Sequence, residues 1–187
     1  MTIRYLADLH FDDEDIIGYD NRPFGSPREM NEAMIDRWNQ VCREDDLTYI
    51  LGDFCAGGAD RWRELLRELN GNKILLTGNH DNAEAAEQMC REGLLAAAVP
   101  YLEMEDRGRH AVLCHYPIVP FHNHYFGWFH LYGHVHAGYE WNLTEHEKRQ
   151  LRRLYVRDDI CRLANAGAMM PYMMYTPRTL DELMKEL

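Results

Sequence analysis

The sequence predicts an α/β fold in which a parallel sheet is followed by a second sheet that is mixed or antiparallel. In the first half, short apolar runs rich in β-branched and aromatic residues alternate with helical periodicity, which is typical of a parallel sheet with crossover helices. In the second half, strand-like runs follow one another across a hairpin-like turn. The strands that end at polar motifs are expected at residues 3–7, 48–51, 73–76, 111–114 and 129–132.

The first crossover helix has a recognisable start. Ser26 and Glu29 have the spacing of a capping box, and Pro27 stands at the first helical position. Apolar residues then recur on one helical face, which we expect to be buried. They are Met30, Met34, Trp38 and Val41.

Two more helices complete the first half. One is expected to begin near Asp60 and to stop at the Asn-Gly-Asn sequence of residues 70–72, and the other to run over residues 82–92. The first of these should bury Leu65, Leu66 and Leu69.

The second half begins with a predicted pair of strands. They are expected at residues 99–104 and 110–114, on either side of a turn at 105–108. A last strand is expected at 160–164, and the pattern from Thr144 predicts a helix that ends at 154.

Composition narrows the class of protein. A length of 187 residues fits one domain, expected over 1–187, and 46% hydrophobic residues are enough for a sizeable core. The N-terminal residues include no apolar stretch suited to a signal peptide or membrane span, so we expect a cytoplasmic protein without a membrane partner. Five cysteines without a CxxC spacing indicate reduced thiols.

The net charge of −11 disfavours long nucleic acid as a partner, because phosphates would be repelled. The exception is a basic segment within residues 148–157. We interpret this segment as a solvated surface offset by neighbouring acidic residues. A basic rim that faces the substrate is the alternative.

Five short polar motifs stand at the ends of predicted strands. Because open parallel sheets bind ligands beyond the carboxyl ends of their strands, we expect these motifs to meet in space. They are Asp8-Leu9-His10, Gly52-Asp53, Gly78-Asn79-His80-Asp81, His115 and Gly133-His134-Val135-His136.

The side chains of these motifs suit a pair of divalent cations. Asp-x-His places both donors on the same side of a strand end, and His134 and His136 repeat this spacing. Mixed Asp, Asn and His donors suit manganese, iron, zinc or nickel, and we favour manganese. The sequence therefore predicts two metal ions as cofactors, with one histidine left over for proton transfer.

At these residues the chain resembles the calcineurin-like metallophosphoesterase superfamily, whose pattern is D-x-H, GD, GNH followed by D or E, H, and GHxH. It is also similar to small single-domain bacterial and phage members, in which a Tyr-x-x-Arg-Pro-Phe stretch like that of residues 19–24 follows the first motif. The resemblance implies two groups of metal ligands bridged by Asp53: Asp8, His10 and His136 for one metal, and Asn79, His115 and His134 for the other.

The family fold implied by this resemblance is an α/β/β/α sandwich of two sheets flanked by helices. The implied activity is hydrolysis of a phosphate ester through in-line attack by a hydroxide that bridges the two metals. The Gly-Asp motif continues as Phe54-Cys55-Ala56, without the Asp-Arg-Gly of serine/threonine protein phosphatases, so protein phosphatase activity is not expected.

His80 and Asp81 are the candidate catalytic pair. His80 follows a predicted ligand and could protonate the leaving group, while Asp81 could orient its imidazole. The alternative is that both residues only start a helix.

Four further residues are candidates for substrate binding. Asn21 and Arg22 follow the first motif and could contact a phosphate or simply form a turn. His122 and His124 lie in an aromatic loop and could line the substrate pocket or be ordinary loop residues.

The predicted function is hydrolysis of a small phosphodiester of the nucleotide or cyclic nucleotide type. A phosphomonoesterase and a nuclease are the enzymatic alternatives. A scaffold of the same fold that only binds metal or protein is the third, although the complete set of seven ligands argues against it.

Overall fold

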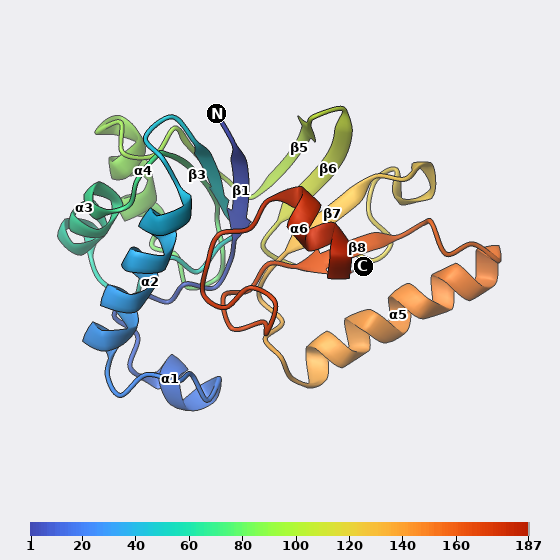
Figure 1. Cartoon of the computed structure of the whole chain (residues 1–187), viewed down its shortest axis with the longest axis horizontal. Helices are drawn as coiled ribbons and strands as arrows, with labels where there is room; N and C mark the ends of the chain where they lie inside the picture. The colour runs from blue at the N-terminus through green and yellow to red at the C-terminus, as the bar shows by residue number, and fades with distance from the viewer. Residues whose placement is uncertain (187) are drawn as a thin grey trace.

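The computed structural model describes residues 1–186 and contains two four-stranded sheets (Figure 1). The first sheet is parallel and has the strand order β1-β2-β3-β4, with bounds Ile3–Leu6, Leu47–Ile50, Asn72–Leu76 and Ala97–Val99. The second sheet has the order β5-β6-β7-β8, with bounds Tyr101–Asp106, Arg109–Cys114, Phe129–Tyr132 and Arg162–Asn165. It is mixed, because β5 is antiparallel to β6 and the other pairs are parallel.

The predicted strand at 99–104 covers the last residue of one strand and most of the next, and these two strands belong to different sheets. β4 ends at Val99 and pairs with β3, whereas β5 begins at Tyr101 and pairs with β6. Pro100 stands between them, and its lack of a backbone N–H favours a break in the ladder. The prediction missed β4 because three residues carry little periodicity.

Helix α2 (Pro27–Val41) begins as predicted. The Ser26 hydroxyl accepts a hydrogen bond from the Glu29 N–H at 3.2 Å, and the Glu29 carboxylate accepts one from the Gly25 N–H at 2.8 Å. In the predicted capping box the Glu29 carboxylate would bond the Ser26 N–H, but in the structure it bonds the N–H of the residue before, Gly25.

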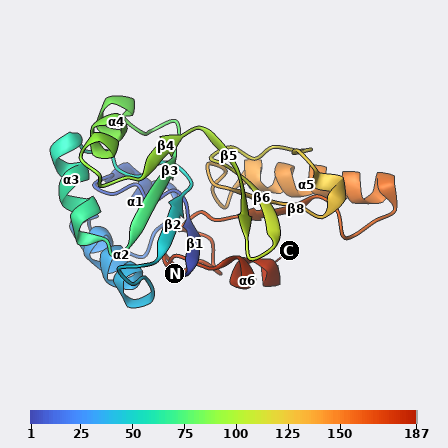
Figure 2. The same ribbon diagram turned by 90° about the horizontal axis from the view of Figure 1, so that it is seen from above.

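Helices α3 (Ala59–Glu68) and α4 (Ala83–Arg91) follow β2 and β3. Figure 2 shows α2, α3 and α4 together beside the first sheet. Their apolar faces enter the main core, where Met34, Trp38, Trp62, Leu65 and Leu66 are almost fully buried.

Helix α5 (Tyr139–Tyr155) lies on the opposite side of the molecule, beyond the second sheet (Figure 2). It begins five residues before Thr144, the predicted N-terminal cap. The Thr144 hydroxyl donates a hydrogen bond to the Glu140 carbonyl at 3.1 Å, so Thr144 lies inside the helix. A smaller apolar cluster that includes Tyr132, Val135 and Ile160 packs against Trp141 and Leu151 of this helix.

Four short helical segments were not predicted: α1 (Asp15–Tyr19), α6 (Leu180–Leu183) and the 3-10 turns η1 (His124–Phe126) and η2 (Met184–Glu186). Thr179 and Glu182 form a complete capping box at α6. None of the helices within residues 1–186 combines the length and apolar character needed to cross a membrane. All five cysteines are free, as expected.

Candidate metal centre

The five predicted motifs meet where the carboxyl ends of β1, β2, β3, β6 and β7 come together. The two residues that follow β1 join the two sheets at this point: the Asp8 N–H donates to the Gly52 carbonyl at 3.0 Å, and the Ala7 N–H donates to the Ala166 carbonyl, just after β8, at 2.7 Å. The Asp8 carboxylate then accepts hydrogen bonds from the His134 N–H at 2.9 and 3.1 Å. Residues far apart in sequence thus share one buried edge.

Four of the predicted ligands have left-handed backbone conformations. The φ angles are 54° at Asp8, 51° at His10, 55° at Asp53 and 67° at His134. Such angles are uncommon for residues with a side chain and cluster at functional sites, where surrounding structure holds them. The backbone is therefore strained at the residues whose side chains converge.

Two glycines leave room for this convergence. Gly52 has a φ of +91°, and a β-carbon there would collide with the imidazole of His115. A β-carbon on Gly133 would lie 2.8 Å from an Asp8 carboxylate oxygen. Both positions need glycine because ligand side chains occupy the adjacent space.

The first ligand group consists of Asp8, His10 and His136, whose donor atoms all lie within 4.8 Å of one another. His10 and His136 each use Nδ1 for a carboxylate, Asp13 at 3.0 Å and Asp20 at 2.6 Å. These contacts leave Nε2 of both rings for another partner, and the buried Nε2 of His10 has no hydrogen bond in the structure.

The second group consists of Asp53, His115 and His134, with donor atoms again within 4.8 Å. The Nδ1–H of His115 donates to the Leu51 carbonyl at 2.8 Å, which directs Nε2 toward the other residues of this group. Asn79 joins this group, because its amide oxygen lies 3.0 Å from that Nε2.

Asp53 lies between the two groups. Its Oδ2 atom is 3.6 Å from Nε2 of His10 and 3.3 Å from Nε2 of His115. Its Oδ1 atom accepts a hydrogen bond from the His80 N–H at 2.9 Å. One carboxylate oxygen is therefore placed beside a histidine of each group, as a bridging ligand requires.

Burial sets the protonation of the first group. It raises the pKa of Asp8 to about 6, although the nearby His136, His115 and the His134 N–H oppose this shift. Burial also lowers the pKa of His10 to about 4, so the imidazole is held neutral and able to donate an electron pair.

In the second group, charge and hydrogen bonding outweigh burial. Burial alone would raise the pKa of Asp53, but His115, the His80 N–H and His10 together lower it to about 2. Burial would lower the pKa of His115, yet Asp53 and Asp8 raise it. Burial and the nearby His115 lower the pKa of His134. In the second group the anionic form of Asp53 and the protonated form of His115 therefore stabilise one another, whereas His134 is biased toward its neutral form.

This donor set fits divalent cations. The buried Nε2 of His10 has no hydrogen-bond partner, and it lies among the carboxylate and imidazole donors of the first group. Oxygen and imidazole donors in two adjoining groups match metals of the manganese, iron, zinc and nickel type.

Three residues behind the ligands were not recognised as a unit from the sequence. Asp13 and Asp20 hold His10 and His136, and Arg22 donates from Nε to Asp20 at 2.9 Å. The remaining Arg22 donors reach the Leu9 carbonyl at 2.9 Å and the Asp8 carbonyl at 2.8 Å. Arg22 is buried, so its contacts support a positioning role and neither a phosphate contact nor a simple turn, the two alternatives that the sequence left open.

The side chains of His80 and Asp81 have different surroundings and do not form a pair. His80 is exposed and lines the cleft, with its ring centroid 5.3 Å from that of His10. The Asp81 carboxylate accepts hydrogen bonds from the N–H groups of Asp53, Phe54 and Gly78 at 2.7–3.0 Å. Asp81 therefore ties the loops after β2 and β3 together, and the structure gives it no contact with the His80 imidazole.

The other substrate candidates lie away from the cleft. Asn21 is exposed in the turn after α1, with a φ of 52°. His122 pairs with Glu103 at 2.8 Å, and Nδ1 of His124 donates to the Phe121 carbonyl at 3.0 Å. The loop that carries both histidines packs beside β5 and the far end of α5, so neither lines a cavity at the centre.

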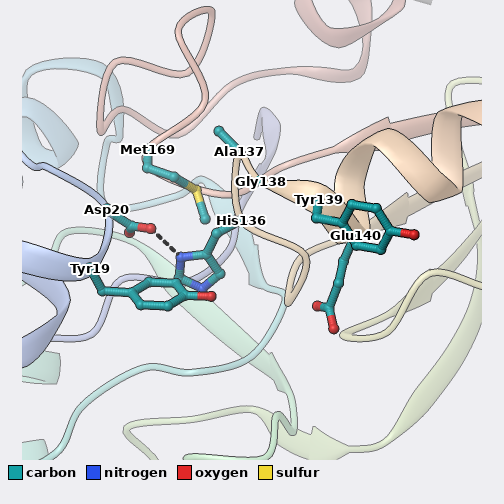
Figure 3. Close-up of a pocket in the computed structure, with 8 residues that line it drawn as sticks. All are labelled: Tyr19, Asp20, His136, Ala137, Gly138, Tyr139, Glu140 and Met169. Atoms are coloured by element: carbon teal, nitrogen blue, oxygen red, sulfur yellow. Dashed lines mark hydrogen bonds and ion pairs between the residues drawn. The ribbon is translucent and has the colours of Figure 1, made fainter.

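Two adjoining cavities open at the metal centre. The first, of about 460 Å³, is lined by His10, Asp13, Asp15, Ile16, Tyr19, Asp53, Ala56, Asn79, His80, His134, His136 and Glu140. The second, of about 510 Å³, shares Tyr19, His136 and Glu140 with it (Figure 3). The basic segment lines a separate hollow at the end of α5, with Arg149, Arg152, Arg153 and Arg157.

The basic segment is partly neutralised by its neighbours. Lys148 pairs with Glu145 at 2.8 Å, and Arg157 pairs with Asp159 at 2.6 Å. Since the basic side chains do not line either cavity at the centre, their placement supports a solvated surface over a basic rim at the substrate.

Comparison with known proteins agrees with this geometry. The family model described as calcineurin-like phosphoesterase matches residues 1–165. The chain is 34% identical over 139 residues to the uncharacterized protein MJ1445 of Methanocaldococcus jannaschii, a match that covers 73% of this chain and 70% of that protein.

Two solved structures are similar. The protein of unknown function AQ665 from Aquifex aeolicus superposes with a TM-score of 0.71 and 24% identity, over 99% of this chain and 98% of the other, which supports the fold. YfcE, a phosphoesterase from E. coli, gives a TM-score of 0.35 with 18% identity, over 72% of this chain and 69% of the other.

Proposed function

The chain belongs to the calcineurin-like phosphoesterase family, and from this premise we propose that it hydrolyses a small phosphodiester of the nucleotide or cyclic nucleotide type with two divalent metal ions. The observation that supports this most strongly is the position of Asp53 Oδ2, at 3.6 Å from His10 Nε2 and 3.3 Å from His115 Nε2. A single carboxylate between two groups of donors suits a dinuclear centre.

The ligands divide into the two groups described above, with Asn79 added to the second. When bound, two divalent ions would lower the pKa of a water molecule and withdraw charge from the phosphoryl group. Manganese is the metal that we favour, and iron, zinc and nickel suit the same donors.

His80 is the proposed proton donor. It lies on the exposed side of the cleft, and its backbone is fixed by the hydrogen bond to Asp53. In the reaction a water oxygen forms a bond to phosphorus while the ester P–O bond breaks. His80 gives a proton to the departing oxygen. The attacking water releases a proton to solvent, and His80 takes one up from solvent.

The charge around the cleft supports a diester as the substrate. Asp13, Asp15 and Glu140 line it, and its lining residues include no lysine or arginine. A monoester carries one negative charge more than a diester near neutral pH and would be repelled more strongly by these carboxylates. The same argument disfavours long nucleic acid, which needs basic contacts along its backbone.

Turnover of two chromogenic esters tests the proposal. Protein stripped with a chelator and reloaded with manganese should hydrolyse bis(p-nitrophenyl) phosphate with a higher kcat/KM than p-nitrophenyl phosphate. The stripped protein should be inactive toward both. Activity that survives metal removal would contradict the proposal, and a preference for the monoester would favour a phosphomonoesterase.

Asp53→Asn is the decisive variant for this assay. It should reduce turnover of the diester more than about a hundredfold, beyond the range typical of residues that only support a ligand. Far-UV circular dichroism should show an unchanged fold. Full activity in a folded Asn variant would exclude the bridging role.

A further inference from the structure

The cavity of about 510 Å³ beside the metal centre has the size of a small-molecule site. It shares three lining residues with the reactive cleft: Tyr19, His136 and Glu140. A group attached to the reacting phosphate could therefore extend past the His136 side of the centre into this cavity.

Aromatic side chains stand on two sides of the cavity. Tyr19 and Tyr139 are 78% and 82% exposed, and Figure 3 shows them on either side of His136. The Tyr19 ring meets the His136 ring edge-on, with centroids 5.5 Å apart. The thioether of Met169 also lies beside His136 (Figure 3). Exposed rings and a polarisable sulfur favour a flat, apolar ligand surface.

The acidic groups that line this cavity, Asp20 and Glu140, are acceptors of hydrogen bonds. Asp20 is already paired with His136 and Arg22, but the Glu140 carboxylate has no hydrogen bond or ion pair with any residue in the range 1–186. The residues that line the cavity include no lysine or arginine. A second phosphate would face these carboxylates unpaired, whereas a ring that carries N–H groups would be complemented.

We infer that this cavity is the subsite for the nucleoside of the substrate, with the base against Tyr19 and Tyr139 and an N–H group of the base bonded to Glu140. The inference rests on the proposed function for the position of the phosphate. It narrows the substrate class to esters with one phosphate and one nucleoside and excludes esters of nucleoside polyphosphates.

His80 gives the nucleoside a direction in the site. The rings of His80 and His136 each lie close to that of His10, at centroid distances of 5.3 and 5.5 Å. His136 borders the nucleoside cavity and His80 does not. With His80 as the proposed proton donor, the departing oxygen lies on the side of His80, and the nucleoside is the group that stays on the phosphate.

Two esters with the same leaving group test the subsite. Methyl p-nitrophenyl phosphate and thymidine 5′-(p-nitrophenyl phosphate) both release p-nitrophenolate and differ only in the retained group. Manganese-loaded protein should favour the thymidine ester in kcat/KM by at least about tenfold. Tyr19→Ala and Tyr139→Ala should each reduce this ratio at least about fivefold, as expected for the loss of stacking on a base.

Matched variants separate stacking from loss of structure. Tyr19→Phe should keep the ratio, since the ring is retained. Tyr155→Ala removes a half-exposed tyrosine from the other end of α5 and should leave both esters unaffected. An equal kcat/KM for the two esters, or an unchanged ratio in both alanine variants, would overturn the subsite and leave the proposed function standing.

Binding supplies a readout that needs no turnover. In calorimetric titrations of the manganese-loaded protein, thymidine 5′-monophosphate should bind at least about tenfold more tightly than methyl phosphate, and Tyr139→Ala should remove most of this difference. If neither ester is cleaved, the proposed function fails, and equal affinities for the two phosphates would then overturn the subsite as well.

Discussion

Asp13 and Asp20 show how single residues outside the motifs shape the centre. Each carboxylate binds Nδ1 of a predicted ligand histidine and so directs the opposite nitrogen, Nε2, toward the other donors. Arg22 extends one of these contacts by bonding Asp20 and two carbonyls of the first motif. Burial raises the pKa of Asp20, but the contacts with His136 and Arg22 outweigh it and lower that pKa, so Asp20 stays anionic.

Asp20→Asn is expected to weaken metal binding by about 10- to 100-fold at the group that contains His136, because the amide no longer fixes the imidazole as strongly. Manganese titration calorimetry measures this affinity. Asp36→Asn, an exposed change on α2, is the matched control and should bind like the wild type. An Asp20 variant with wild-type affinity and normal thermal stability would show that the contact does not organise the ligand.

The sequence was sufficient to find the seven candidate ligands that converge in the structure, but not the residues behind them. The candidate ligands lie in short motifs at strand ends, where a local pattern indicates them. Asp20 and His136 are 116 positions apart, and only the folded chain shows that they meet. Tyr139 and Glu140 carry no sequence signal beyond following the last motif, whereas Tyr19 begins a stretch that is similar to members of the family.

At the scale of elements, Lys73 joins a strand to a helix. It is the second residue of β3, and its buried Nζ donates to the Leu66 carbonyl at 2.9 Å and to the Leu69 carbonyl. These carbonyls belong to the last turn and C-terminal cap of α3, which has no later N–H groups to bond them. Burial lowers the pKa of Lys73 to about 8.

This lysine should make stability depend on pH. Below pH 8 it is charged in both states, and burying the charge costs free energy. Between pH 8 and its ordinary value of 10.5 the folded state has lost the proton that the unfolded state keeps, so stability rises with pH. The unfolding free energy of the wild type minus that of Lys73→Met should therefore increase by roughly 2 kcal/mol from pH 7 to pH 10.

Urea unfolding of both proteins at the two pH values measures this difference, and other groups that titrate in the same range cancel in the subtraction. A difference that does not change with pH would mean that the lysine keeps its ordinary pKa in the folded protein.

Elements with strong periodicity could be predicted, and those set by tertiary contacts could not. The strands that end at motifs and the helices α2, α3 and α4 agree with the sequence to within one or two residues. β4, α1 and α6 are too short to show a period. The start of α5 was placed late because Thr144, which has the pattern of a cap, bonds back into its own helix.

At the scale of the whole molecule, the centre depends on two sheets that present their carboxyl ends to one another. The sequence predicted two sheets, and the family resemblance supplied their arrangement as a sandwich. The contacts of Asp8 with Gly52 in one half and His134 in the other join them at the site. Because each ligand group draws on both halves, the centre forms only when both sheets are in place.

Metal stoichiometry tests this account most directly. Protein stripped with a chelator should bind two manganese ions per chain in a calorimetric titration, and anomalous diffraction from crystals grown with manganese should place both ions on either side of Asp53. One ion or none per chain, or two ions away from the groups of Asp8 and His115, would contradict the dinuclear centre.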